Sequence, residues 1–228
     1  MIQRGIVYDV YDTHTESIKQ AVVVTVDRWN ATMSTVGVIF VGPPEDPDTL
    51  WTPILAAPEP MQVTVGHLVI VRGGAVQNPR ARLPAAALDQ IANGLRDVMA
   101  FPHVHGSPPQ APPAGPGGVY PRWSQVYYLT GETREHGRLP EPKRFLVVST
   151  DEWNEGNDYV LAVRLTSQRK NPPAAFPNVS RGASRACCGD LTAIRATQLS
   201  RGRRPDVQFL PLADMARVAH GLTVTHEL

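Results

Sequence analysis

Apolar positions along the chain occur in short runs that are separated by polar and turn-forming residues. The segment IVYDVYD (6–12) alternates between apolar and polar residues, which predicts a strand with one buried face. The runs AVVVTVD (21–27), VGVIFV (36–41) and HLVIVR (67–72) are rich in β-branched residues and predict buried strands. The same series of predicted strands returns later, at QVYYLT (125–130), FLVVSTD (145–151), YVLAVRL (159–165) and DLTAIRA (190–196).

Two further segments have the spacing of amphipathic helices, and each opens with Leu-Pro. Proline fits the first turn of a helix because its missing N–H would be unpaired there anyway. Each helix follows a set of strands, so the pattern predicts a mainly β fold of the α+β class. We expect two similar units, each a small, strongly bent sheet or barrel that is closed by a C-terminal helix. The apolar residues at helical spacing are Leu88, Ile91, Leu95 and Val98 in the first helix and Leu212, Met215, Val218 and Leu222 in the second.

The order of these segments reveals an internal repeat. KQAVVVTVDRWN (19–30) and KRFLVVSTDEWN (143–154) share six of twelve positions. LPAAALDQIANGL (83–95) and LPLADMARVAHGL (210–222) share six of thirteen. Blocks that correspond in the same order with similar spacing indicate a tandem duplication. Two more blocks correspond in register, VYDV (7–10) with VYYL (126–129) and VGHLVIVR (65–72) with CGDLTAIR (188–195).

A segment rich in proline and glycine separates the two copies. Residues 102–121 contain seven prolines and four glycines, a composition that cannot form a core element and predicts a semi-extended, mobile tether. The predicted domains are therefore residues 1–101, a linker at 102–121 and residues 122–228. The histidines of the linker are interpreted as exposed residues rather than metal ligands.

Composition narrows the possible classes of protein. The chain has 228 residues, of which 42% are hydrophobic and 19% charged, as in soluble globular proteins. No apolar run approaches the roughly 20 residues of a membrane helix and no signal peptide is evident, so we expect a cytoplasmic protein without a membrane partner. The only cysteines, Cys187 and Cys188, are adjacent in sequence and predict neither a disulfide nor a metal site.

The two halves differ in charge, although the whole chain has a formal net charge of +1. Residues 1–121 carry 7 Lys and Arg against 10 Asp and Glu, which gives −3, and residues 122–228 carry 15 against 11, which gives +4. A polyanionic partner would favour the second half. A merely solvated surface with surplus arginines accounts for the same numbers.

The second copy contains a series of motifs in a characteristic order. A lysine and an arginine enter a valine-rich strand that ends in Asp-x-Trp-Asn (143–154), and VLAVRLTSQRK (160–170), DLTAIRATQLS (190–200) and a final helix follow. In this order the motifs resemble the MazF/PemK family of toxin endoribonucleases, which share an SH3-like barrel with the CcdB gyrase poisons. The resemblance covers most of residues 123–225 and, more weakly, residues 4–100.

This resemblance implies an architecture and an activity. Members of the family are homodimers with an RNA groove across the two-fold interface, so two tandem SH3-like barrels would form a pseudo-dimer within one chain. The family cleaves single-stranded RNA without a metal or cofactor, through attack of the neighbouring 2′-hydroxyl on the phosphate. An antitoxin protein would be the inhibitor.

The resemblance also implies the residues of the site. Arg144 corresponds to the catalytic cation, whose planar fork can hold two phosphate oxygens, and Thr166, with Ser167 beside it, corresponds to the hydroxyl that positions the phosphate and relays protons. Phe145 departs from the family pattern, which usually has proline after the arginine. The residues expected to bind the substrate are Lys143, His136, Arg138, Arg164, Arg169 and Lys170. The alternative for His136 and Arg138 is a place on a mobile loop, and that for Arg164, Arg169 and Lys170 is a solvated surface.

The first copy lacks this chemistry. Gln20 stands at the position of Arg144, Gly42 at that of Thr166, and acidic residues follow in GPPEDPD (42–48). We therefore predict that the first copy is catalytically inactive and that one active site at most remains. The alternative hypothesis is a pseudo-dimer that has lost catalysis altogether and binds a protein or a nucleic acid, including a role like that of the gyrase poisons.

Overall fold

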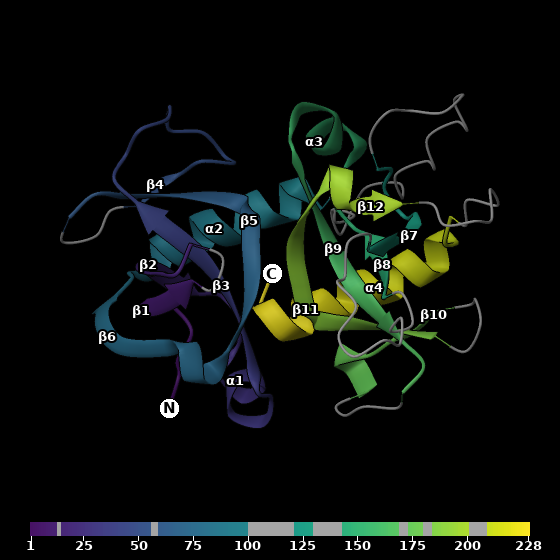
Figure 1. Ribbon diagram of the computed structural model, residues 1–228, viewed down its shortest axis with the longest axis horizontal. Coiled ribbons are helices and arrows are strands. Elements are labelled where there is room, and N and C mark those ends of the chain that lie inside the picture. Colours follow the sequence, from purple (N-terminus) through teal and green to yellow (C-terminus); the bar gives the residue numbers. More distant parts are fainter. Residues whose placement is uncertain are drawn as a thin grey trace. The chain divides into compact units, whose positions relative to one another are not determined.

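The structure, a computed structural model, describes residues 1–12, 15–55, 59–99, 121–129, 143–168, 173–179, 184–200 and 209–228 (Figure 1). The predicted linker (apart from Pro121) and the predicted substrate-binding residues His136, Arg138, Arg169 and Lys170 lie outside these ranges. No helix within the described ranges has the length and hydropathy needed to cross a membrane.

The first repeat forms a curled antiparallel sheet of six strands in the order β4-β5-β3-β2-β1-β6. Its long strand is β5, Met61–Arg72, which pairs along most of its length with β3. The other strands are β1 (Ile6–Asp12), β2 (Ser17–Val23), β3 (Thr35–Gly42), β4 (Ile54–Leu55) and β6 (Val76–Arg82); the helices are α1 (Asp27–Thr32), the short 3₁₀ turn η1 (Gly73–Ala75) and α2 (Ala85–Val98).

The second repeat forms a sheet with the same strand order, β10-β11-β9-β8-β7-β12. Its long strand is β11, Ser184–Arg195, which has the same twelve-residue length as β5. The other strands are β7 (Val126–Leu129), β8 (Arg144–Val147), β9 (Tyr159–Thr166), β10 (Asn178–Val179) and β12 (Leu199–Ser200); the helices are α3 (Asp151–Gly156), η2 (Pro173–Ala175), η3 (Ala196–Gln198) and α4 (Leu212–His226).

Strand pairing confirms the alignment of the two repeats residue by residue. Asp9 pairs with Gln20 in the first sheet, and Tyr128 pairs with Arg144 in the second. Ala21 likewise pairs with Phe40, and Phe145 with Arg164. The predicted mainly β fold, with two curled antiparallel sheets and a C-terminal helix in each repeat, is thus confirmed.

The chain divides into two compact units. Unit 1 comprises Met1–Val98, Gly189–Thr192 and Leu222–Leu228, and unit 2 comprises Met99–Cys188 and Ala193–Gly221. The end of α4 and part of β11 therefore group with the first repeat. The predicted domain boundaries at residues 101 and 122 stay predictions, since residues 100–120 lie outside the described ranges.

The inside of each curl holds the apolar core. In unit 1, alternate residues of β1, β2 and β3 point inward, because side chains of a strand alternate between its two faces. Unit 2 has two clusters in the corresponding place, one around Tyr127 and Val147 and one around Phe145 and Ala162. The buried cluster of unit 1 consists of Tyr8, Val10, Ala21, Val23, Val36, Val38 and Val76.

At one cross-strand pair the aromatic ring lies on a different strand in the two repeats. In the first sheet the small Ala21 faces Phe40 across the strands, whereas in the second Phe145 faces Arg164. Phe145 is buried against Ala162 and Ile194. This burial gives a physical reason for the phenylalanine that departs from the family pattern, since its ring fills the inside of the second curl.

The repeated Asp-x-Trp-Asn motif begins a short helix in each repeat. In α3 the N-cap Thr150 accepts a hydrogen bond from the backbone N–H of Trp153 at 3.1 Å. The Asn154 side chain donates to the carbonyl of Ser149 at 3.1 Å, and Asn30 donates to that of Thr25 at 3.0 Å. The asparagine of the motif therefore supports the structure in both repeats.

A glycine brings each long helix against its long strand. A Cβ atom at Gly94 of α2 would lie 2.4 Å from the carbonyl oxygen of Leu50 and 3.0 Å from Val65 of β5. A Cβ atom at Gly221 of α4 would lie 2.6 Å from the sulfur of Cys188 in β11. The two glycines occupy equivalent positions of the repeat, and so do Val65 and Cys188. The helix thus meets the strand at a distance that only glycine permits.

Gly94→Ala should lower the free energy of unfolding by about 1–3 kcal/mol, because the added methyl group meets a backbone oxygen that cannot move aside freely. Gly156 of α3 provides the matched control, since a Cβ atom there would meet nothing within 4 Å. Gly156→Ala should be neutral or stabilise by up to about 1 kcal/mol. Urea unfolding followed by circular dichroism measures both, and equal effects of the two substitutions would contradict the close-contact interpretation.

The last residue of α4, His226, is fully buried in unit 1. Its Nδ1 lies 2.8 Å from the hydroxyl of Thr225, and its Nε2 has no hydrogen-bond partner among the described residues. Burial is the main cause that lowers the pKa of the imidazole to about 4. The folded protein therefore holds a neutral histidine here through the mildly acidic range.

Stability should decrease as the pH falls from about 6.5 towards 4, because the unfolded chain takes up a proton at His226 in this range and the folded chain does not. The loss should reach about 2 kcal/mol by pH 5, and His226→Gln should remove that part of the pH dependence. Urea unfolding at several pH values tests this, with His220→Gln, at an exposed position of the same helix, as the control for loss of a histidine. An unchanged pH profile in His226→Gln would refute it.

Candidate active site

Arg144 is the first residue of β8, and its side chain is held by a residue of β11. It pairs with Tyr128 of β7 and Leu165 of β9. Its Nη2 donates a hydrogen bond to the hydroxyl of Ser184, the first residue of β11, at 2.9 Å. Ser184 is only 1% exposed, so its hydroxyl is held in place. This is the one hydrogen bond that the described residues give to the Arg144 side chain, and a guanidinium carries five N–H groups.

Thr166 is the last residue of β9, directly after the partner of Arg144. Its hydroxyl oxygen accepts a hydrogen bond from the backbone N–H of Gln168 at 3.2 Å. Ser167 follows in an exposed bend, and Lys143 is exposed just before β8. The structure therefore places these four predicted residues at the same end of the β8–β9 pair.

The register of β8 and β9 separates the two main candidates by face. Arg144 and Leu165 are directly opposite, so their side chains share one face of the sheet. Arg164 shares the other face with Phe145, its direct partner, and by alternation so does Thr166. A group that contacts both Arg144 and Thr166 must therefore bind at the end of the strands, where the two faces meet.

The equivalent place in unit 1 holds an ion pair. Gln20 stands where Arg144 does, and its partner across the strands is Asp9. The Asp9 carboxylate accepts hydrogen bonds from Nε and Nη2 of Arg80 at 2.9 and 2.6 Å and from Asn78 at 3.2 Å. The hydrogen bonds of Arg80 hold the pKa of Asp9 below its usual value. The guanidinium near this position is thus engaged by a carboxylate.

The segment that follows β3 in unit 1 is fixed and acidic. The buried side chain of Gln62 accepts hydrogen bonds from the backbone N–H groups of Glu45 and Asp46 at 3.0 and 2.9 Å. The same side chain donates to the carbonyl of Asp46 at 2.8 Å. Exposed carboxylates therefore lie next to Gly42, the equivalent of Thr166, where a phosphate would be repelled.

Two residues that distinguish the candidate site from its equivalent in unit 1 have no signal in the sequence. Ser184, which anchors Arg144, lies 40 residues from it, and Arg80 lies 71 residues from Asp9. Neither residue belongs to a recognisable motif, so only the folded sheet identifies them. Among the described residues, no three His, Cys, Asp or Glu side chains gather closely enough to hold a metal ion.

No protein-family model and no curated protein sequence matches the chain. Among solved structures, an endoribonuclease in complex with its cognate antitoxin from a mycobacterial species is 14% identical with a TM-score of 0.41, over 45% of this chain and 99% of that one. The Mycobacterium tuberculosis toxin MazF-mt6 is 8% identical with a TM-score of 0.35, over 40% and 92%. MazF from Deinococcus radiodurans is 17% identical with a TM-score of 0.32, over 46% and 96%. The chain is thus similar to MazF-type endoribonuclease toxins, each of which covers less than half of it.

Proposed function

We propose that the protein is a toxin-type endoribonuclease with a single active site in unit 2, at the end of β8 and β9. The observation that carries the proposal is the asymmetry of equivalent positions. Unit 2 has a guanidinium anchored by Ser184 and a neighbouring hydroxyl, while unit 1 has Gln20 and Gly42. Cation and hydroxyl are the two groups that cleavage of RNA by its own 2′-hydroxyl requires.

In this reaction the 2′-oxygen attacks the adjacent phosphorus and the bond from phosphorus to the 5′-oxygen breaks. The products are a 2′,3′-cyclic phosphate and a 5′-hydroxyl, the proton of the 2′-hydroxyl being lost and the leaving oxygen gaining one. Arg144 stabilises the negative charge that builds on the non-bridging oxygens, because its fork can bind two of them at once. Thr166 positions the phosphate and relays protons through its hydroxyl.

The sequence resemblance supports the setting of this activity. The substrate is single-stranded RNA, the inhibitor is an antitoxin protein, and the protein acts in the cytoplasm as part of a toxin–antitoxin system. Lys143 and Arg164, at the same end of the strands, supply further positive charge for the phosphate backbone. The chemistry assigned to these residues uses no metal.

Arg144→Ala and Thr166→Ala should each reduce RNA cleavage about 100-fold or more, as loss of a group that stabilises transition-state charge typically does. The assay incubates purified protein with mixed-sequence RNA in EDTA and separates the products by gel electrophoresis. Gln20→Ala is the matched control at the equivalent position of unit 1 and should leave the rate unchanged. Intact RNA with the wild-type protein would contradict the proposal. A large loss of cleavage in Gln20→Ala would show that the site had been assigned to the wrong unit.

Ser184→Ala should lower kcat about 5- to 10-fold with little change in KM, because it removes one hydrogen bond that orients Arg144. A double-mutant cycle separates this positioning role from a general structural one. In the Arg144→Ala background, Ser184→Ala should have no further effect on cleavage. An additional loss of the same size would show that Ser184 acts independently of Arg144.

The alternative function is a binding module without catalysis. The observation that favours it is the register, which puts the side chains of Arg144 and Thr166 on opposite faces of the sheet. In that case the protein would bind RNA or a protein without cleaving it. The cleavage assay in EDTA decides between the two functions, since the module leaves RNA intact at any protein concentration.

A further inference from the structure

Arg185 is the second residue of β11 and directly follows Ser184. It pairs with Asn178 of β10. Gln62 has the same place in unit 1, because it is the second residue of β5 and pairs with Ile54 of β4. The two repeats therefore differ here, with a guanidinium in unit 2 where unit 1 has a neutral amide.

The repeat places Arg185 across from Thr166. In unit 1, Gln62 is the direct partner of Gly42, the last residue of β3. Thr166 is the equivalent last residue of β9, and β9 and β11 are neighbours in the second sheet. The equivalence of the two sheets thus pairs Arg185 with Thr166, and directly paired residues share one face of a sheet.

The hydrogen bond of Ser184 agrees with this register. Ser184 accepts from Arg144, whose side chain shares a face with Leu165. Since side chains alternate between the two faces of a strand, Arg185 lies on the opposite face, which is that of Thr166. The strand ends therefore carry one guanidinium on each face, and Thr166 has a cation on its own face.

Arg185 cannot replace Gln62 in the loop contacts of unit 1. The Gln62 amide accepts from the backbone N–H groups of Glu45 and Asp46 and donates to the carbonyl of Thr52 at 2.9 Å. A guanidinium has five N–H donors and no acceptor. Within the described residues, its hydrogen bonding consists of one contact, from Nη1 to the carbonyl of Phe176 at 3.4 Å. An arginine at this position therefore suits an oxygen-rich ligand better than it suits the loop.

The segments around the two positions have opposite charge. Residues 35–65 of unit 1 contain four Asp and Glu and no Lys or Arg. The equivalent residues 159–188 of unit 2 contain five Lys and Arg and no Asp or Glu. The sequence around Arg185 thus provides no carboxylate to neutralise it, and it attracts an anion where unit 1 would repel one.

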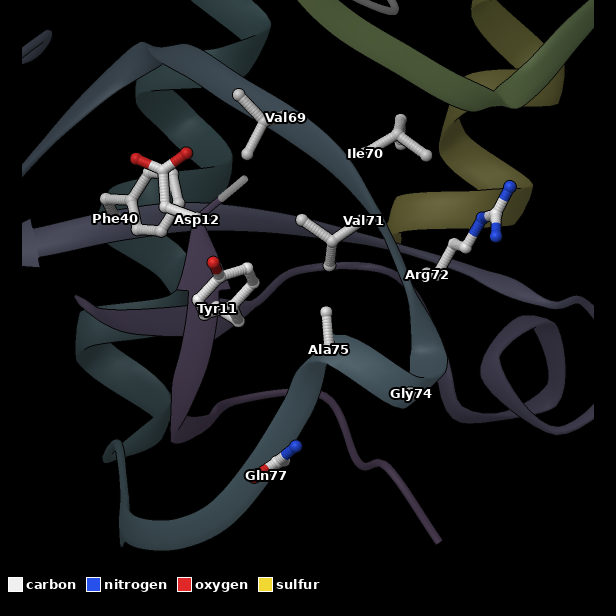
Figure 2. Close-up of a pocket in the computed structure, with 10 residues that line it drawn as sticks. All are labelled: Tyr11, Asp12, Phe40, Val69, Ile70, Val71, Arg72, Gly74, Ala75 and Gln77. Atoms are coloured by element: carbon white, nitrogen blue, oxygen red, sulfur yellow. The ribbon is translucent and has the colours of Figure 1, made fainter. Parts of the chain in front are cut away.

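The corresponding face of unit 1 is apolar. Phe40 stands at the position of Arg164, and by alternation it shares a face with Gly42. Together with Val69 and Val71 of β5, Phe40 lines a pocket of about 650 Å³ (Figure 2). Such walls cannot replace the water around a charged phosphate, so of the two faces the one in unit 2 suits a phosphate.

We propose that Arg185 binds a second phosphate of the RNA, the neighbour of the phosphate that is cleaved. This deepens the proposed function and rests on it, because single-stranded RNA is taken as the ligand of the strand ends. Arg144 holds the cleaved phosphate, and the RNA passes over Thr166 to bring the next phosphate to Arg185. The planar guanidinium binds two oxygens of that phosphate at once. Arg185 is thus a substrate-binding residue and takes no part in breaking the bond.

The test measures binding of the full chain to a mixed-sequence RNA oligonucleotide with 2′-O-methyl groups, which lacks the attacking hydroxyl and stays intact. Fluorescence anisotropy at several salt concentrations gives the affinity and its salt dependence. Arg185→Gln, which introduces the residue of unit 1, should weaken binding about 10-fold. It should also lower the slope of log affinity against log salt concentration by about 0.7, as expected for one phosphate contact of a single strand.

Arg195→Gln is the matched control, because it removes the same charge from the last residue of β11, where Arg195 donates to Tyr159. This variant should keep the salt slope of the wild type. Arg185→Lys should also keep the slope and lose part of the affinity, since an ammonium cannot bind two oxygens in a fork. Thermal unfolding verifies that each variant is folded.

Cleavable RNA locates the phosphate that Arg185 contacts. Arg185→Gln should raise KM with little change in kcat, because it removes a contact made equally in the ground state and the transition state. A fall in kcat at unchanged KM would overturn the proposal, since Arg185 would then act on the cleaved phosphate.

The proposal is also overturned if Arg185→Gln and Arg195→Gln have the same salt slope, or if the wild-type protein does not bind the methylated oligonucleotide. A failure of the nuclease proposal appears differently, as intact RNA with the wild-type protein in EDTA. The salt slopes still decide on Arg185 in that case, because they are measured on an RNA that cannot be cleaved.

Discussion

Each repeat depends on the close contact between its C-terminal helix and its long strand. Gly94 brings α2 against Val65 of β5, and Gly221 brings α4 against Cys188 of β11. Each long strand continues through a 3₁₀ turn into the edge strand of the same sheet, so fixing it also fixes the curl. The inside of the curl is then small enough to be filled by a few side chains, and the strand ends that carry the candidate chemistry are set at its rim.

The two repeats retain this scaffold and differ at the strand ends. The Asn of each short helix makes the same hydrogen bond to a backbone carbonyl before the helix in both repeats, whereas Gln20 and Arg144 have diverged. Such a division is expected when copies share one chain, because only their common fold has to be kept in both. One copy can then keep a cation and a hydroxyl while the other has neither at the equivalent positions.

The helices and strands could be predicted from the sequence, but the contacts between them could not. The strands, the helices and the repeat were predictable because β-branched runs, helical spacing and block order are local properties. The bond from Arg144 to Ser184 and the opposite faces of Arg144 and Thr166 were not, because both follow from pairing between segments far apart in the chain.

The different placement of the phenylalanine in the pairs Ala21–Phe40 and Phe145–Arg164 has a consequence for the gene. Similar repeats within one reading frame can recombine with each other, and a crossover between the two positions of this pair would bring together strands of different copies. One product would place Phe145 opposite Phe40, two rings in a space shaped for one, and the other would place Ala21 opposite Arg164 and leave a void. Recombinant chains would thus fold poorly, which protects the difference between the copies from being erased.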